Sequence, residues 1–160
     1  MGDRRKTVLI ADDHVRVRDG IKMLVSSILG PVHFLEAGDG HSLSRVIQLH
    51  PVIDLAQVDL NMPGMEKGFR LTELARQRPS LAVVVVSALT APDVVRRTLN
   101  IPSVYAFVPK SATSDRMRSA IEAALQGIRL PYTPSSSKAL RQTLPSRRAS
   151  KKYAPCCARA

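Results

Sequence analysis

Short apolar runs alternate with amphipathic stretches five times between residues 7 and 130, and this alternation constrains the fold more than any other feature. The apolar runs predict strands at 7–11, 32–36, 53–58, 81–86 and 104–108. The amphipathic stretches predict helices at 15–29, 42–50, 67–77, 93–99 and 114–126. Strict strand–helix alternation is typical of parallel sheets. We therefore expect an α/β fold, a doubly wound five-stranded parallel sheet with helices on both faces.

Polar side chains stand at the carboxyl ends of four of these predicted strands. Asp12 and Asp13 follow the first strand, Asp59 the third, Ser87 the fourth and Lys110 the fifth. In such sheets the ligand site lies beyond the carboxyl ends of the strands. The sequence thus predicts that three acids, one hydroxyl and one ammonium group meet at one edge of the sheet.

This set of side chains indicates phosphoryl chemistry. Three carboxylates at one edge repel each other and need a cation. Their oxygens suit Mg²⁺, which keeps several waters and so leaves positions open for phosphoryl oxygens. Lys110 would bring a positive charge and Ser87 a hydroxyl donor to those oxygens. Because a carboxylate can itself be the nucleophile, the set predicts phosphoryl transfer through an aspartyl-phosphate.

Each of these residues also has an ordinary structural interpretation. Asp12 and Asp13 could cap the helix that follows them, which is a frequent role of aspartate. Ser87 alone would be a plain residue after a strand, and Lys110 alone a solvated lysine. The functional interpretation depends on their occurrence as a set. The histidines, His14 included, show no ligand spacing.

Four stretches of the chain resemble the receiver domain of two-component response regulators. They are VLIADDH, DLAQVDLNMPGM, VVVVSA and AFVPKSA, in the order and approximate separations of that family. The resemblance covers about residues 6–127, and the FVPKS ending is similar to the branch with a helix-turn-helix output domain. It implies a flavodoxin-like receiver fold and a protein that accepts a phosphoryl group from a sensor histidine kinase in a phosphorelay. It also implies a role in transcription regulation.

The resemblance further implies the phosphorylation and metal sites. Asp59 would be the phosphoacceptor and a Mg²⁺ ligand. Asp13 would bind the ion directly and Asp12 through water. Asn61 would contribute its backbone carbonyl.

The remaining implied roles concern signal output. Ser87 would bind the phosphoryl group and Lys110 would pair with it. Phe107, three residues before that lysine, is placed like the aromatic switch of the family, although an aromatic there is as readily a plain core residue. Ser87 would be drawn inward on phosphorylation and Phe107 would follow. The face of the fourth helix, fifth strand and fifth helix would then change for a partner, including a homodimer.

The character of the chain changes after residue 130 to proline, serine and basic residues. Of the formal net charge of +11, seven positive charges and no acid lie there. We expect a receiver domain at 1–130 and a basic tail at 131–160 that is disordered or a truncated output region. About thirty residues are too few for a helix-turn-helix domain with its linker, which leaves DNA binding open. The ending CCARA is compatible with a truncation, a frame change or a natural short tail.

Two other functions remain as alternatives. An aspartyl-phosphate phosphatase or phosphotransferase on the same fold would need a substrate pocket from long loops, and the loops here look short. A protein that binds nucleic acid mainly through the basic tail would need elements that read the bases, and none is evident in the sequence. We therefore expect a signalling domain rather than an enzyme, with at most slow self-dephosphorylation. No apolar run is long enough to cross a bilayer and no secretory signal is evident, so cytoplasm is expected.

Overall fold

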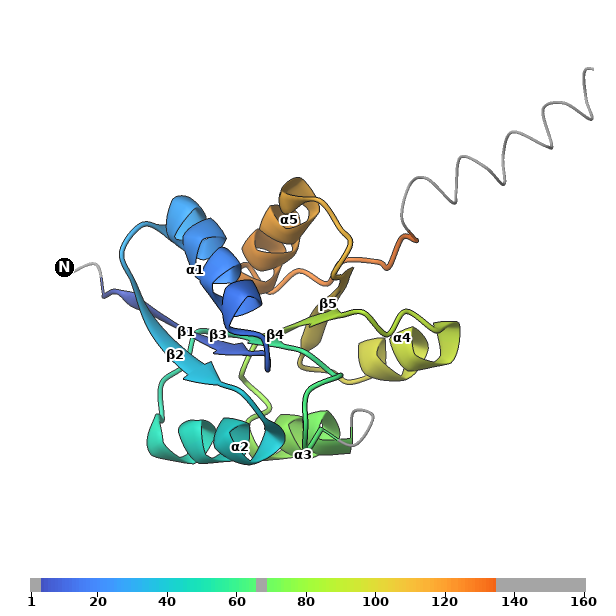
Figure 1. The fold of residues 1–160 in the computed structure, drawn as a ribbon, viewed down its shortest axis with the longest axis horizontal. Coiled ribbons are helices and arrows are strands. Elements are labelled where there is room, and N and C mark those ends of the chain that lie inside the picture. Colours follow the sequence, from blue (N-terminus) through green and yellow to red (C-terminus); the bar gives the residue numbers. More distant parts are fainter. Residues whose placement is uncertain (1–3, 66–68, 135–160) are drawn as a thin grey trace, which may run out of the picture.

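The computed structural model describes residues 4–65 and 69–134, which form one parallel sheet flanked by helices (Figure 1). The strand order is β2-β1-β3-β4-β5. The strands are β1 (Lys6–Ala11), β2 (Val32–Ala37), β3 (Leu55–Val58), β4 (Val83–Ser87) and β5 (Val104–Pro109). The helices are α1 (Val15–Leu29), α2 (Gly40–Leu49), α3 (Phe69–Gln77), α4 (Pro92–Leu99) and α5 (Ser114–Leu125). The predicted α/β fold is confirmed.

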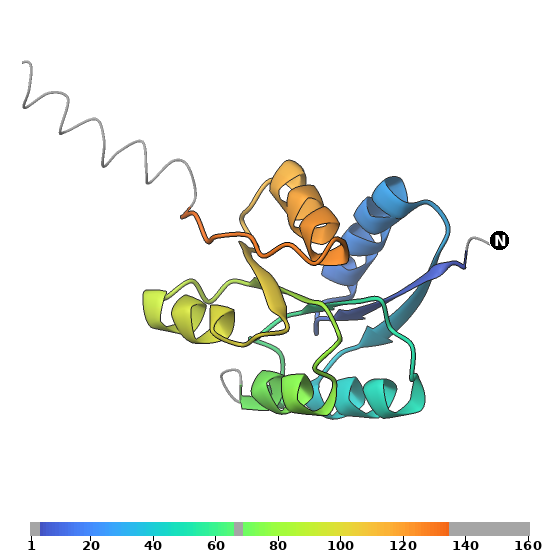
Figure 2. The ribbon, with the colours of Figure 1, turned by 180° about the vertical axis from the view of Figure 1, so that it is seen from behind.

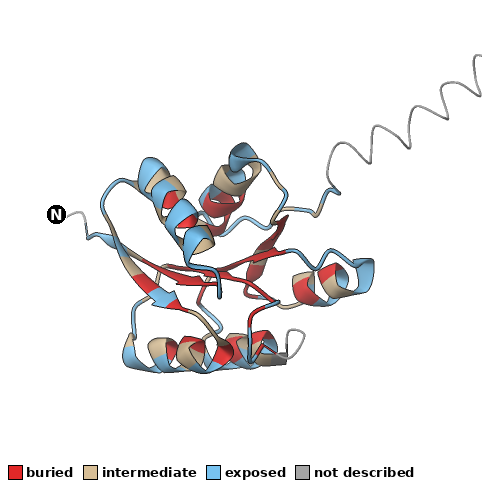
Figure 3. Cartoon of the chain, viewed as in Figure 1, coloured by how far each residue is buried: buried red, intermediate tan, exposed pale blue. Residues whose placement is uncertain are grey.

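Helices cover both faces of the sheet, so the central strands are buried throughout (Figure 3). Along β1, Val8 and Ile10 point into the cluster beneath α1 and α5. Leu9 and Ala11 point into the cluster beneath α2, α3 and α4. This two-sided burial explains why the strand is an uninterrupted apolar run rather than an alternating one.

The beginning of α2 differs from the prediction, which placed it at residue 42. The helix begins at Gly40 because Asp39 is its N-cap. The Asp39 carboxylate accepts a hydrogen bond from the Ser42 backbone N–H at 2.7 Å, and the Ser42 hydroxyl accepts one from the Asp39 N–H at 3.2 Å. This reciprocal capping box satisfies two N–H groups that lack partners within the helix. Other bounds differ by one or two residues, and the predicted start of α3 at 67 lies outside the described residues.

The side-chain amide of Gln57 on β3 is buried without a hydrogen-bond partner among the described residues. Gln57 is 2% exposed and lies between Ile10 of β1 and Val84 of β4 in the sheet. Because its neighbours along β3, Ala56 and Val58, belong to the cluster on the opposite face, its amide points toward α1 and α5. Neither atom of that amide has a hydrogen-bond partner among the described residues. Each such buried group costs about 1–3 kcal/mol.

The chain after α5 turns at Gly127, whose φ is +74°, and runs back along β5 (Figure 2). The Leu130 N–H donates to the Tyr105 carbonyl at 2.8 Å. Leu130 and Tyr132 both pack against the core clusters. The domain boundary at 130 remains a prediction, because most of the tail assigned to 131–160 lies outside the described residues. None of the described helices is long and apolar enough to span a membrane.

Candidate functional site

The carboxyl ends of the strands meet at one edge, and backbone hydrogen bonds hold the first residue after β1, β3 and β5. The Asp12 N–H donates to the Ala37 carbonyl at 3.0 Å, and the Asp59 N–H donates to the Ala11 carbonyl at 2.9 Å. The Lys110 N–H donates to the carbonyl of Ser87 at 3.0 Å. The sheet itself therefore fixes the backbone from which these side chains extend.

Three of the side chains predicted from the strand ends form one ionic cluster. The Lys110 ammonium lies 2.8 Å from Asp59 Oδ2 and 3.0 Å from Asp12 Oδ2. The side chains of Asp12 and Asp59 are 0% and 1% exposed, whereas that of Lys110 is 23% exposed. Two buried carboxylates thus share one cation that reaches them from the solvent side.

Two opposing effects set the pKa of Lys110. Burial lowers this pKa, and the contacts of the ammonium group with the carboxylates of Asp59 and then Asp12 raise it by more. The net result is a pKa above the ordinary value of lysine. Lys110 therefore stays an ammonium group at neutral pH, and its charge is directed at the carboxylates.

The remaining carboxylate oxygens of the cluster have few partners. Asp59 Oδ1 accepts the backbone N–H of Asn61 at 2.9 Å, and Asp12 Oδ1 accepts that of His14 at 2.8 Å. Asp12 Oδ2 is buried and has no aligned hydrogen bond among the described residues, despite its ionic contact with Lys110. Such an oxygen retains lone pairs for a further ligand.

Asp13 extends the cluster toward solvent together with His14. The His14 Nδ1 atom lies 2.9 Å from Asp13 Oδ1 and 3.3 Å from Asp12 Oδ1, and the three residues form a group that could hold a metal ion. His14 was not predicted to belong to this group, although its position directly after two aspartates was a usable signal. The N-cap residue of α1 is His14. The alternative interpretation, in which Asp12 or Asp13 caps this helix, is therefore wrong.

Ser87 and Phe107 occupy different places relative to this cluster. Ser87 is completely buried, and its hydroxyl oxygen accepts the Leu89 N–H at 3.1 Å. The backbone carbonyl of Ser87 accepts the hydrogen bond from the Lys110 N–H, so Ser87 lies at the same edge of the sheet as the ionic cluster. Phe107 is 3% exposed and belongs to the core beside α4. Tyr132 packs edge-to-face against it at a ring distance of 5.6 Å.

The loop that carries Asn61 is held against the start of α2. The Gly40 N–H donates to the Pro63 carbonyl at 2.7 Å, and Arg70 Nε donates to the Gly64 carbonyl at 2.8 Å. A Cβ atom on Gly40 would clash with the carbonyl oxygen of Gly64, which no side chain could tolerate without a shift of the loop. Local sequence patterns do not reveal this approach, and the prediction missed it.

The donor set of the edge fits a hard divalent cation. Asp12, Asp13 and Asp59 supply three carboxylates against the single ammonium group of Lys110, which leaves two negative charges. Carboxylate and carbonyl oxygens are the ligands that Mg²⁺ takes in proteins, usually with several waters retained. The arrangement can therefore bind a cation and anionic oxygens side by side.

Comparison with known proteins agrees with this geometry. Residues 8–122 match the family model of the response regulator receiver domain. The chain is 34% identical over 120 residues to the glycerol metabolism activator of Pseudomonas putida, covering 75% of this chain and 54% of that protein. It is 30% identical over 123 residues to the response regulator GacA of Pseudomonas viridiflava, covering 76% and 56%. The chain thus spans about half the length of these relatives.

Solved structures show the same fold. RcsB of Salmonella typhimurium superposes with a TM-score of 0.70 at 26% identity, covering 85% of this chain and 66% of that chain. The signal receiver domain of an HD domain-containing protein from Pseudomonas fluorescens gives a TM-score of 0.69 at 18% identity, covering 78% and 97%. With a family model matched over most of its length, the chain belongs to the response regulator receiver domain family.

Proposed function

We propose that this protein is cytoplasmic and accepts a phosphoryl group on Asp59 from a sensor histidine kinase. The observation that carries the proposal is the ionic cluster itself. Asp59 is buried at the sheet edge, with its Oδ2 atom 2.8 Å from the Lys110 ammonium. Buried charges are expensive, so a carboxylate kept there beside Asp12 and Lys110 indicates a chemical role rather than a structural one.

The transfer needs little beyond position and charge neutralisation. A carboxylate oxygen of Asp59 attacks phosphorus, and a P–O bond forms while the P–N bond to the donor imidazole breaks. The electron pair of the broken bond remains on the imidazole nitrogen, and Asp59 becomes an acyl phosphate. Lys110 is placed to pair with a phosphoryl oxygen, and Ser87 supplies a hydroxyl at the same edge.

Mg²⁺ is the proposed cofactor. Asp13 and Asp59 would bind it directly, Asp12 through water, and Asn61 through its backbone carbonyl. The buried Asp12 oxygen without a hydrogen bond and the surplus of negative charge support this assignment. When bound, the ion would neutralise charge on the phosphoryl oxygens. The Gly40 contact keeps the loop that bears Asn61 in one place.

The proposed output is a change on the face of α4, β5 and α5. Ser87 would turn toward the phosphoryl group and Phe107 would shift after it, so that this face meets a partner or a second copy of the chain. A structure of RcsB bound to the promoter rprA is among the similar ones. We infer by likeness that the switch serves a transcriptional output, with the receiver at 1–130 and the basic tail at 131–160.

The test is phosphorylation by a small donor. Incubation with acetyl phosphate and Mg²⁺ should add one phosphoryl group, seen by intact mass spectrometry, and chelation of Mg²⁺ should prevent it. Asp59→Asn should abolish the adduct, and Asp93→Asn, at an exposed position on α4, should not. Labelling of Asp59→Asn at the parent rate would contradict the proposal. Rapid turnover of acetyl phosphate without any adduct would favour the phosphatase or phosphotransferase alternative.

A further inference from the structure

The segment of residues 129–134, here called the docked segment, lies on the face formed by α4, β5 and α5 (Figure 2). Its first residue is an anchor. The Arg129 guanidinium donates to the carbonyls of Leu99 and Ile101 at 2.8 Å and to that of Val104 at 3.1 Å. These carbonyls lie at the end of α4, in the turn that follows it and at the first residue of β5. A cation is favoured at the carboxyl end of a helix.

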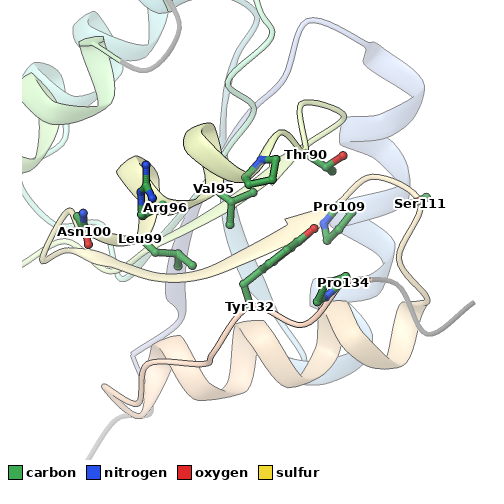
Figure 4. Close-up of a pocket in the computed structure, with 10 residues that line it drawn as sticks. Thr90, Val95, Arg96, Leu99, Asn100, Pro109, Ser111, Tyr132 and Pro134 are labelled. Atoms are coloured by element: carbon green, nitrogen blue, oxygen red, sulfur yellow. The ribbon is translucent and has the colours of Figure 1, made fainter. Parts of the chain in front are cut away.

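Tyr132 is the side chain of this segment that reaches the core. Its ring meets Phe107 edge-to-face with centroids 5.6 Å apart, and the Arg116 guanidinium of α5 lies 5.8 Å from its centroid. The ring forms one wall of a groove of about 840 Å³, with Val95 and Leu99 of α4 opposite it (Figure 4). Tyr132 therefore touches β5 and α5 and faces α4.

The contact between Tyr132 and Phe107 is weak enough to form and break reversibly. Tyr132 is half-buried, and its neighbours Pro131 and Thr133 are exposed. Besides the Arg129 anchor, the Leu130 bond to β5 and the packing of Leu130 against the core, the segment is held by the contacts of the Tyr132 ring with Phe107 and Arg116. An edge-to-face pair adds only a modest stabilisation, so its loss when Phe107 moves costs the domain little.

We propose that the docked segment is a latch whose release is coupled to the state of Asp59. Tyr132 holds the segment on β5 in the unphosphorylated chain, and a shift of Phe107 on phosphorylation removes the surface on which Tyr132 packs. The release rests on the function proposed above, whereas the docking does not. The latch thus passes the signal along the chain itself to the residues that follow 134.

Hydrogen exchange of the Leu130 amide measures the latch directly, because that amide is bonded to the Tyr105 carbonyl. Tyr132→Ala should raise its exchange rate by about fivefold, the factor expected from loss of an aromatic pair. Thr133→Ala is the matched control and should leave the rate unchanged. Tyr132→Phe keeps the ring and should also leave it unchanged.

The second part of the experiment measures the effect of phosphorylation on the latch. Acetyl phosphate with Mg²⁺ should speed exchange at Leu130 in the parent chain, and by reciprocity Tyr132→Ala should reach a higher phosphorylated fraction than Thr133→Ala. Unchanged exchange in Tyr132→Ala would overturn the latch, and unchanged exchange in the phosphorylated parent would overturn its release. If mass spectrometry shows no phosphate uptake, the proposed function fails and the release fails with it. Exchange at Leu130 in Tyr132→Ala and Thr133→Ala still tests whether Tyr132 docks the segment.

Discussion

The unsatisfied amide of Gln57 gives a quantitative test of the core. Replacing it in Gln57→Met keeps an unbranched side chain of similar size and removes both polar atoms. Each orphan group costs about 1–3 kcal/mol, and some of that gain is lost to imperfect repacking. We expect the free energy of unfolding to rise by about 2 kcal/mol.

Thermal and urea denaturation followed by circular dichroism would measure this change. At roughly 4 °C per kcal/mol, the melting temperature of Gln57→Met should rise by about 8 °C. Gln48→Met, at an exposed position on α2, is the matched control and should stay within about 0.5 kcal/mol of the parent. A melting temperature at or below that of the parent would show that the amide is satisfied in solution and that the burial argument is wrong.

Three further predictions concern the site and its support. Lys110→Ala leaves its carboxylate partners facing each other and should cost roughly 3 kcal/mol without Mg²⁺, with partial recovery when the ion is added, as read from melting temperatures. Gly40→Ala should lower stability by roughly 2 kcal/mol and reduce the melting shift that Mg²⁺ produces, whereas Gly20→Ala, with open space around it, should do neither. A hydrogen bond from Lys22 keeps the pKa of Glu36 below its ordinary value, so this carboxylate stabilises the fold above its ordinary pKa and loses that effect as pH falls through the lowered one. Glu36→Gln should therefore show a smaller fall in melting temperature than the parent between about pH 7 and about pH 3, and an equal fall would contradict the assignment.

The fold and the edge cluster could be predicted because both follow from periodicity. Apolar runs indicate where the strands lie. Parallel strands bring their carboxyl ends to one edge of the sheet, independently of the loop conformations. Asp59, Asp12 and Lys110 therefore meet although they lie far apart in the sequence. The start of α2 was predictable too, since Asp39 followed three residues later by Ser42 is a capping pattern, but the apolar periodicity alone placed it too late.

Contacts between distant backbone segments could not be predicted. The approach of Gly40 to Gly64 depends on how the loop after β3 closes onto α2, and no local pattern encodes it. Tyr132 lies in the stretch after residue 130 whose composition indicates a linker or tail, and Arg129 lies directly before that stretch. Their places on β5 and α4 depend on the turn at Gly127 and on tertiary packing, which outweigh local composition.

The most direct test of the central claim is to locate the phosphoryl group by chemistry. The parent chain is treated with acetyl phosphate and Mg²⁺, the acyl phosphate is reduced with borohydride, and the protein is digested for peptide mapping by mass spectrometry. We predict that position 59 alone is converted to homoserine, and only when Mg²⁺ was present. Conversion at Asp12 or Asp13 with Asp59 intact, or at none of the three, would contradict the account.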